Sequence, residues 1–386
     1  MRRLLILACS VVFLEVAFFS VLTPLLPDYR SDLGLSEAGV GLLSGSFAAG
    51  TLVAALPAGW FVARFNSRRA VLIGLVGMGI FSPIFGFAEQ TWLLDLSRFF
   101  QGASGAMLWA GAISWVVSAG PPEQRGSLVG TVIAAAVVGE LTGAPLGVLA
   151  HQIGTEIVFS SVFLLAIILG FMAWSIPSPS SVESQRIDQA VDAARGSGLL
   201  PSILLLAAPS FAFGLIVVLA PLRMDDLGAT PLLIAAAFAA GSVAEAVVGP
   251  LVGRYSDRVG RTGPYLVGIA IVAVAIAVVG IFADLTVIFV AVIFIAFGSG
   301  IAFTPASTLI ADVAAAAGLN QGYASGAANV AWGGGQMLGA IGAGVLTGLS
   351  GYLLPALITV FVLGATGTVA RSIAARAPAE AAPEPT

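Results

Sequence analysis

The chain has 386 residues, of which 58% are hydrophobic and only 9% are charged, and its net charge is −4. A soluble domain cannot cover its surface with so few charged residues, so the composition excludes an ordinary soluble protein and favours a membrane protein. The single cysteine excludes an internal disulfide, and the single histidine excludes a histidine-based metal site. The sequence therefore offers few residues of the kinds that act as nucleophiles or bind metals in enzymes, and we expect no catalytic residue, metal or cofactor.

Twelve apolar runs are each long enough to cross a bilayer as a helix, which takes ~20 residues. They are too long, and too continuously apolar, for the strands of a β-barrel. The predicted helices cover residues 4–27, 38–62, 70–88, 92–118, 128–150, 157–175, 199–222, 231–252, 264–283, 285–311, 322–348 and 352–370. The sequence thus predicts an all-α integral membrane protein. Arg2 and Arg3 precede the first run as in a signal peptide, but that run is too long for a signal core, so we expect a retained helix.

Arginine alone sets the predicted orientation, because the chain has no lysine. With the N-terminus inside, most arginines fall on the inner side, and the positive-inside rule then places both termini in the cytoplasm of a multi-pass inner (plasma) membrane protein. These inner arginines are Arg2, Arg3, Arg64, Arg68, Arg69, Arg125, Arg186, Arg195, Arg254, Arg258, Arg261, Arg371 and Arg376. The outer connections carry the acids Asp28, Asp32, Glu37, Glu156, Asp225, Asp226 and Asp284.

The chain contains an internal repeat. Residues 26–34 (LPDYRSDLG) are similar to residues 220–228 (APLRMDDLG), with an offset of 194 residues. The tetrapeptide Phe-Ala-Ala-Gly at residues 47–50 recurs at residues 238–241, with an offset of 191. Matches that keep their order at about half the chain length indicate two copies of one unit.

The repeat predicts two pseudo-symmetric six-helix bundles, residues 1–175 and 199–371. A polar cytoplasmic linker, residues 176–198, joins them, and residues 372–386 are expected to be a disordered cytoplasmic tail. Parallel six-helix halves are a transporter architecture in which the substrate site lies between the halves, near the middle of the membrane.

Four acids lie in or at the end of apolar segments: Glu15, Glu140, Glu245 and Asp312. A carboxyl group at bilayer depth costs about 3 kcal/mol or more, so we expect it to hold a proton, hold a cation or pair with arginine. For Glu15 the alternative is a protonated side chain bonded to a neighbouring helix, and we favour a functional role. Glu245 fits a solvated inner cavity equally well, and Asp312 fits a simple position at the inner face slightly better than a binding role.

The loop after the eighth predicted helix combines turn-forming glycines with charges. These residues are Gly253, Asp257, Arg258, Gly260 and Arg261, and their pattern resembles the loop signature of the major facilitator superfamily. The first half departs from the pattern, with Ala63 in place of the acid and Asn66 in place of glycine. By the twofold relation, we expect Asp257 to contact Arg125 and the start of the fifth helix at residues 126–129, where a helix N-terminus also favours an acid. This contact would close the inner face.

Two more segments resemble signatures of this superfamily. Arg98 to Ala106 resembles its Arg-x-x-Gln-Gly pattern, and an arginine within a helix must pair, face water or extend to the membrane surface. Gly139, Gly143 and Gly147 repeat every four residues around Pro145, which resembles the helix-5 signature of drug:proton antiporters. We expect this glycine stripe to approach a helix of the other half and to act in gating. The alternative is an ordinary small-residue interface.

The first helix strengthens the resemblance to the drug:proton antiporter branch, which includes vesicular-amine and multidrug exporters. Glu15 is followed by Thr23 and Pro24, as in the first helix of those proteins, and Asn329 occupies a place where that branch can carry an acid. The resemblance implies a proton-coupled antiporter that exports a small, cationic or lipophilic compound by alternating access. The coupling candidates are Glu15, then Glu140 and Arg98, followed by Glu245, Asp312 and Asn329. The aromatic residues Phe18, Phe19, Trp109, Trp115 and Trp332 are candidate linings of a cation pocket or ordinary packing residues.

One alternative within the transporter class is a proton-coupled or passive importer of a neutral or anionic solute, with Arg98 binding the substrate. Outside that class stand a membrane enzyme and a non-transporting receptor, although a receptor would not need two symmetric halves. We expect a monomer whose partners are a small-molecule substrate, protons and the lipid bilayer, with no nucleic acid.

Overall fold

The computed structural model describes residues 1–121, 124–177 and 187–376, and all regular secondary structure in these ranges is helical. The first half contains α1 (Arg2–Ser20), the 3₁₀ turn η1 (Thr23–Leu25), α2 (Leu26–Asp32), α3 (Glu37–Arg64), α4 (Ser67–Phe87), α5 (Thr91–Ala119), α6 (Arg125–Ile153) and α7 (Thr155–Ser175). After α8 (Ile187–Ala194), the second half contains α9 (Leu199–Asp226), α10 (Pro231–Val259), α11 (Thr262–Ile281), α12 (Leu285–Ala316), α13 (Gln321–Ser350) and α14 (Leu353–Arg376).

Helical structure is present at all twelve predicted positions. Eleven helical segments are long and apolar enough to cross a membrane, counting α1 to α2 as one. The glycine-rich α13 has 30 residues and is the twelfth long helix. The short α8 lies within the predicted linker, whose residues 178–186 are outside the described ranges. Residues 377–386 of the predicted tail are also outside them, whereas α14 continues to Arg376.

The first membrane segment is interrupted, so the prediction of one continuous helix over residues 4–27 is wrong. α1 ends at Ser20, and the chain passes through η1 before α2 begins at Leu26. Pro24 lacks an N–H group and cannot donate the next hydrogen bond of an α-helix. The interruption lies where the first half faces the second, because η1 packs against α6, α9 and α10.

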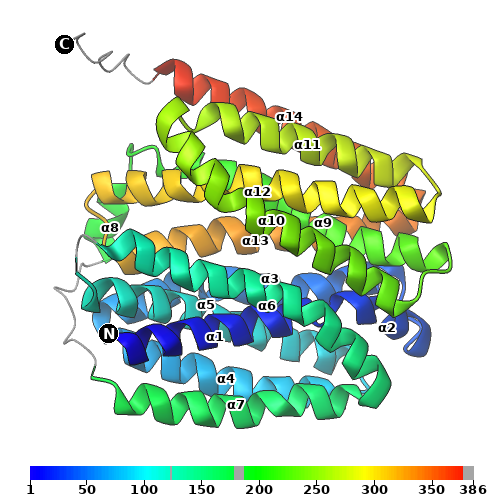
Figure 1. Cartoon of the computed structure of the whole chain (residues 1–386), viewed down its shortest axis with the longest axis horizontal. Helices are drawn as coiled ribbons and strands as arrows, with labels where there is room; N and C mark the ends of the chain where they lie inside the picture. The colour runs from blue at the N-terminus through cyan, green and yellow to red at the C-terminus, as the bar shows by residue number, and fades with distance from the viewer. Residues whose placement is uncertain (122–123, 178–186, 377–386) are drawn as a thin grey trace.

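The two ends of the bundle differ in charge. The start of α1, the end of α14 and α8 lie together at one end of the bundle, and α2 lies at the other end (Figure 1). We call the first the arginine-rich end, since it carries the inner arginines named above that lie within the described residues. We call the second the acidic end, since it carries Asp28, Asp32, Asp225, Asp226 and Asp284.

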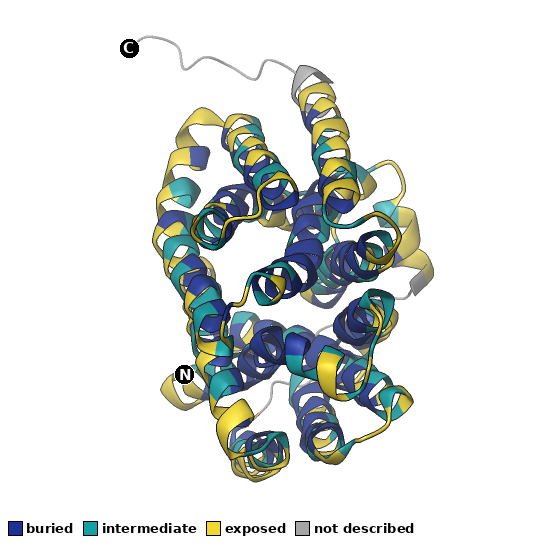
Figure 2. Ribbon diagram, turned by 90° about the vertical axis from the view of Figure 1, so that its right-hand side faces the viewer, coloured by how far each residue is buried: buried dark blue, intermediate teal, exposed yellow. Residues whose placement is uncertain are grey.

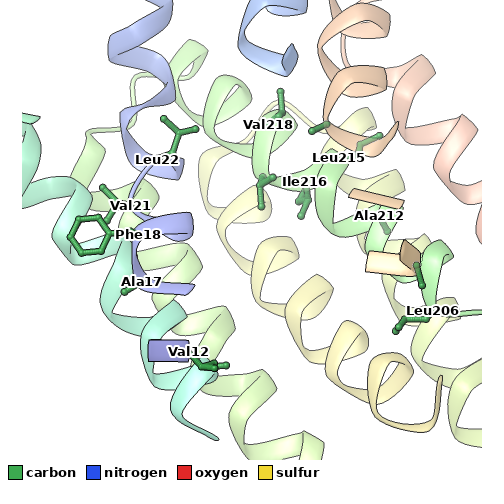
Figure 3. Packing of buried hydrophobic residues seen from close by; sticks show 14 of the residues in the cluster. Val12, Ala17, Phe18, Val21, Leu22, Leu206, Ala212, Leu215, Ile216 and Val218 are labelled. Atoms are coloured by element: carbon green, nitrogen blue, oxygen red, sulfur yellow. The ribbon is translucent and has the colours of Figure 1, made fainter. Parts of the chain in front are cut away.

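The core lies where the helices face each other. Viewed along the bundle, buried residues gather on the facing sides of the helices and exposed residues lie on the perimeter (Figure 2). The perimeter includes large apolar side chains such as Phe171, Leu349 and Phe361, which suits contact with lipid rather than water. Figure 3 shows part of the core, with labelled residues Val12, Ala17, Phe18, Val21 and Leu22 on or after α1 and Leu206, Ala212, Leu215, Ile216 and Val218 on α9.

α3 of the first half and α13 of the second half form a close seam. A Cβ atom built on Gly41 would lie 2.7 Å from the carbonyl oxygen of Ala340, and one on Gly344 would lie 2.2 Å from that of Glu37. Near the arginine-rich end, a Cβ on Gly59 would lie 2.5 Å from the carbonyl oxygen of Gly322. Glycine therefore lets the two backbones touch along nearly their full length, which is how membrane helices associate without a hydrophobic driving force.

This seam predicts opposite effects for two substitutions on one helix. Gly344→Ala places a methyl group against the rigid backbone of α3, and we expect it to destabilise the protein by about 1–3 kcal/mol. Gly342→Ala is the matched control, because nothing lies within 4 Å of its Cβ position. Thermal unfolding in detergent should show a lower Tm for Gly344→Ala and an unchanged or higher Tm for Gly342→Ala. Equal Tm values would show that the seam is not tightly packed.

Candidate functional site

A narrow pocket lies between the two halves. Its lining comes from α1, η1 and α6 of the first half and from α9 and α10 of the second. The lining residues are Phe19, Ser20, Thr23, Glu140, Ala144, Phe213, Val217, Phe238 and Ser242, and none of them is basic. The break after α1 places Thr23 in this pocket. This is the position between the halves that the repeat predicts for a transport site.

Aromatic residues from equivalent positions of the repeat meet at this pocket. Phe19 and Phe213 are 194 residues apart, the offset of the repeat, and their ring centroids are 6.4 Å apart. Phe47 and Phe238 are equivalent in the Phe-Ala-Ala-Gly match, and Phe47 lies 5.1 Å from Phe19. Trp332 of α13 meets Phe19 edge to face at 5.6 Å. The pocket thus has ring faces from both halves, which suits a flat or cationic ligand.

Two carboxyl groups from opposite halves lie near each other at the pocket, one of them in its lining. Glu140 of α6 interacts with the hydroxyl group of Ser242 on α10. Glu245, one turn further along α10, is close enough to Glu140 for their charges to interact. Glu245 also packs on α12, where a Cβ built on Gly300 would lie 3.0 Å from its Cγ. The structure therefore brings together two of the predicted site residues, which lie far apart in the sequence.

Glu15 lies in a different place, inside the first half between α1 and α5. The residue is only 4% exposed, and its Oε2 accepts a hydrogen bond of 2.8 Å from the indole of Trp109. The absence of a side chain at Gly105 makes room for it, because a Cβ there would lie 2.6 Å from Oε1. Glu15 is thus a buried carboxyl group that does not line the pocket.

Arg98 is buried and does not extend to the membrane surface. The residue is 1% exposed, and its guanidinium group donates hydrogen bonds of 3.2 Å to the carbonyl oxygens of both Phe18 and Phe19. Both carbonyls belong to the last turn of α1, where a helix leaves C=O groups without helical partners. Arg98 also donates to Gln101 at 3.0 Å and lies 4.8 Å from the ring centroid of Phe47. It therefore braces the interruption of the first membrane segment and does not line the pocket.

The glycine stripe of α6 faces α1 of its own half, so the prediction of a partner in the other half is wrong. A Cβ on Gly139 would lie 2.7 Å from the carbonyl oxygen of Phe13, and one on Gly143 would lie 2.4 Å from that of Ala17. A Cβ on Gly147 would meet Val21, beyond the end of α1. Pro145 lies within α6 between them. The contact of α6 with α10 uses another face of the helix, the one that carries Glu140.

Asp312 and Asn329 lie apart from the pocket lining. Asp312 is exposed near the arginine-rich end of α12 and forms an ion pair of 2.5 Å with Arg261. This contact ties the loop after α10 to α12 within the second half. The Nδ2 atom of Asn329 on α13 is buried and has no hydrogen-bond partner in the described part of the chain. Neither position supports a direct contact with a ligand in the pocket.

The loop from Gly253 to Arg261 has the geometry that its glycines predict, without the expected clasp. Gly260 has a φ of +86° and a ψ of 160°, a conformation that essentially only glycine adopts. Asp257 is exposed and forms no ion pair with Arg125 in the described residues, and Arg125 donates to the carbonyl oxygen of Val117. The clasp was expected only when the arginine-rich end is closed, so it stays a prediction.

Several contributors to the site were missed in the sequence. The pocket is also lined by Ser242, Phe213 and Phe238, which belong to none of the family signatures. The internal repeat was the only sequence signal for the two phenylalanines, since it relates Phe213 to Phe19 and Phe238 to Phe47. Of the aromatic candidates, Phe18 packs edge to face on Phe159 at 5.7 Å. Trp115 is a buried core residue. These two are packing residues rather than pocket linings.

Known proteins agree with this architecture. The model of the Major Facilitator Superfamily matches residues 8–208 and again residues 202–386, which together cover both halves. The chain belongs to the major facilitator superfamily. The protein is accordingly a multi-pass membrane protein of this superfamily, and the two matches correspond to the two copies of the repeat.

Named relatives are similar to only part of the chain. The "MFS-type transporter ppzB" of Metarhizium rileyi is 32% identical over 185 residues, which cover 46% of this chain and 38% of that protein. "Multidrug resistance protein 2" of Bacillus subtilis is 24% identical over 167 residues, which cover 43% of this chain and 42% of that protein. A "Probable vesicular acetylcholine transporter-B" of Danio rerio is 27% identical over 190 residues, with coverage of 47% and 38%. The chain spans less than half the length of these relatives.

The bracing role of Arg98 predicts that lysine cannot replace it. A single ammonium group cannot reach both α1 carbonyls and Gln101 in the planar geometry of a guanidinium group. We expect Arg98→Lys to destabilise the protein by about 2 kcal/mol or more, because buried acceptors lose their donors. Arg195→Lys is the control, since Arg195 is exposed on the chain after α8. A Tm of Arg98→Lys equal to that of the parent protein would contradict the brace.

Proposed function

We propose that the protein is a secondary active transporter that exports a small lipophilic or cationic compound in exchange for protons. The observation that carries this proposal is the proximity of Glu140 and Glu245, from opposite halves, at an aromatic pocket without basic residues. A carboxylate attracts a cation, and ring faces add to that attraction. A carboxyl group can hold a proton or pair with a cation but does not do both at once, so the two compete and exchange becomes obligatory.

The position of the carboxyl pair supports alternating access. Because the two acids belong to different halves, any rocking of one half against the other changes their separation and their access to water. We propose that protons enter from the acidic end and leave toward the arginine-rich end. The positive-inside rule favours a cytoplasmic location for the arginine-rich end, with the termini, in the plasma membrane. We propose that one chain suffices, because the pocket is built entirely from its two halves.

The partial relatives favour the same class of substrate. Their printed names include multidrug resistance proteins, a quinolone resistance protein and a vesicular acetylcholine transporter. An anionic solute bound by Arg98 is not supported, because the guanidinium group already donates to the end of α1 and does not line the pocket.

The carboxyl pair predicts the effect of neutral replacements. Glu140→Gln and Glu245→Gln keep the size of each side chain but remove its charge, and we expect each to lower proton-driven transport at least tenfold. The measurement is uptake of a fluorescent lipophilic cation into inside-out proteoliposomes with an acidic lumen. Glu89→Gln, at an exposed position between α4 and α5, is the control and should transport like the parent protein. Parent-like transport by both pocket variants would refute the proposal.

Glu15 should act on coupling rather than on substrate contact. Glu15→Gln keeps an acceptor for the Trp109 indole, so we expect the protein to fold and to bind the substrate normally. We expect it to lose proton-driven transport, because the buried carboxyl group on α1 can no longer exchange a proton. Exchange of substrate across the membrane without a proton gradient should persist. If proton-driven transport is unchanged, Glu15 has only a structural role.

A further inference from the structure

Charged residues join the two halves at the acidic end. Arg30 of α2, in the first half, places its Nη2 atom 2.9 Å from Asp225 Oδ2 and 2.8 Å from Asp226 Oδ1, both at the end of α9 in the second half. All three side chains are about one-quarter to two-fifths exposed. Ion pairs that are partly withdrawn from water, and in which one arginine holds two carboxylates, contribute more than isolated surface pairs.

One partner of Arg30, Asp226, is itself held in place. Asp226 accepts a hydrogen bond from the hydroxyl group of Tyr352, just before α14. Burial raises the pKa of the Tyr352 hydroxyl further above neutral pH, so the group remains a donor at alkaline pH as well. The guanidinium of Arg223 lies 4.5 Å from the centre of the Tyr352 ring and donates to the carbonyl oxygen of Phe282, at the end of α11. Asp226 is thus tied to the residue that precedes α14 and, through Tyr352 and Arg223, to the end of α11.

The first half has a matching support on α2. Asp28 lies near enough to Asp225 for the two charges to repel each other. The ring of His151, on α6, contacts the carboxylate of Asp28 at 2.7 Å. Asp28 is therefore engaged within its own half, and Arg30 remains the cation that faces the second half.

The arrangement is one-sided in two respects. The repeat-equivalent of Arg30 is Met224, which is apolar and buried, so the second half offers no matching arginine. At the other end of the bundle, Asp257 and Arg125 do not pair in the described residues. α2 continues directly from η1, which carries the pocket residue Thr23, so movement of Arg30 and access to the pocket are mechanically linked.

We propose that Arg30, Asp225 and Asp226 form an electrostatic latch that holds the acidic end closed and must break before the pocket opens on that side. This inference concerns the resting conformation and goes beyond the proposed function. It stands whatever the substrate is, because it can be measured in the absence of any substrate.

The test measures the opening of each end with spin labels in a Cys9→Ser background. One label pair, Gln90→Cys and Leu232→Cys, spans the two halves at the acidic end. A second pair, Ser127→Cys and Tyr255→Cys, spans them at the arginine-rich end. We expect Arg30→Gln to raise the ratio of open to closed molecules at the acidic end about tenfold, which corresponds to about 1.4 kcal/mol. The double variant Asp225→Asn with Asp226→Asn should do the same.

Two further measurements separate a latch from a general loss of stability. The pair of changes Arg30→Asp and Asp225→Arg restores opposite charges and should return the ratio to within about threefold of the parent protein. Salt at about 1 M screens partly exposed charges, so it should open the acidic end of the parent but not of Arg30→Gln. Asp192→Asn, which removes an exposed ion pair with Arg195 next to α8, is the matched control and should change nothing.

Three results would overturn the latch. One is a distance distribution at the acidic end that is the same in Arg30→Gln as in the parent. Another is a parent protein whose acidic end does not respond to salt. The third is opening by Arg30→Gln without opening by the double aspartate variant, since the pairing would then not be the cause.

Discussion

The two halves are joined by contacts of different chemical kinds, and this difference organises the molecule. α3 and α13 touch backbone to backbone through glycines over nearly their full length. Such a seam is apolar and tight, and in a bilayer it is stabilised by packing alone. α6 and α10 form the second contact between the halves, and there the facing side chains include Glu140, Ser242 and Glu245. Rocking about the first contact would therefore change the environment of ionisable groups at the second.

The interruption of the first membrane segment is the second organising feature. Backbone groups without partners are costly in a bilayer, so a broken helix persists only where protein groups satisfy them. Arg98 does this for the carbonyls of Phe18 and Phe19, at the point where the chain turns into the pocket. The same turn exposes Ser20 and Thr23 to the pocket and directs α2, which carries Arg30, toward the end of α9. A buried arginine in the first half thus supports both the lining of the pocket and the position of the acidic-end contact.

The fold was largely predictable because its signals are local or repeated. Runs of apolar residues marked every long helix, and the match of residues 26–34 with 220–228 marked the two halves. The exception is the first membrane segment, where Thr23 and Pro24 were noted but the resulting break was not. A proline near the end of an apolar run is compatible with either a bend or a break of the helix. Here the hydrogen bonds that Arg98 donates from α5 to the end of α1 stabilise the break.

The site was predictable as a set of residues but not as an arrangement. Glu15, Glu140 and Glu245 were each conspicuous as acids in apolar helices, yet the sequence ranked Glu15 first. It could not show that Glu15 faces Trp109 within one half, while Glu140 and Glu245 lie near each other across the two. The glycine stripe of α6 likewise identified a packing face without identifying the partner, because small-residue spacing is the same whichever helix it contacts. Arg30 looked like an ordinary charge of an outer connection, since its partners lie 195 and 196 residues away.

The central claim is that protons and substrate compete for carboxyl groups at the interface of the halves. Proton release on ligand binding tests it most directly, with purified protein in weakly buffered detergent solution and a pH-indicator dye. Titration with tetraphenylphosphonium, a lipophilic cation, should release protons as the cation binds. Glu140→Gln and Glu245→Gln should each release fewer protons per bound cation than the parent protein. Binding of the cation without proton release, or with a release that neither substitution changes, would contradict the account.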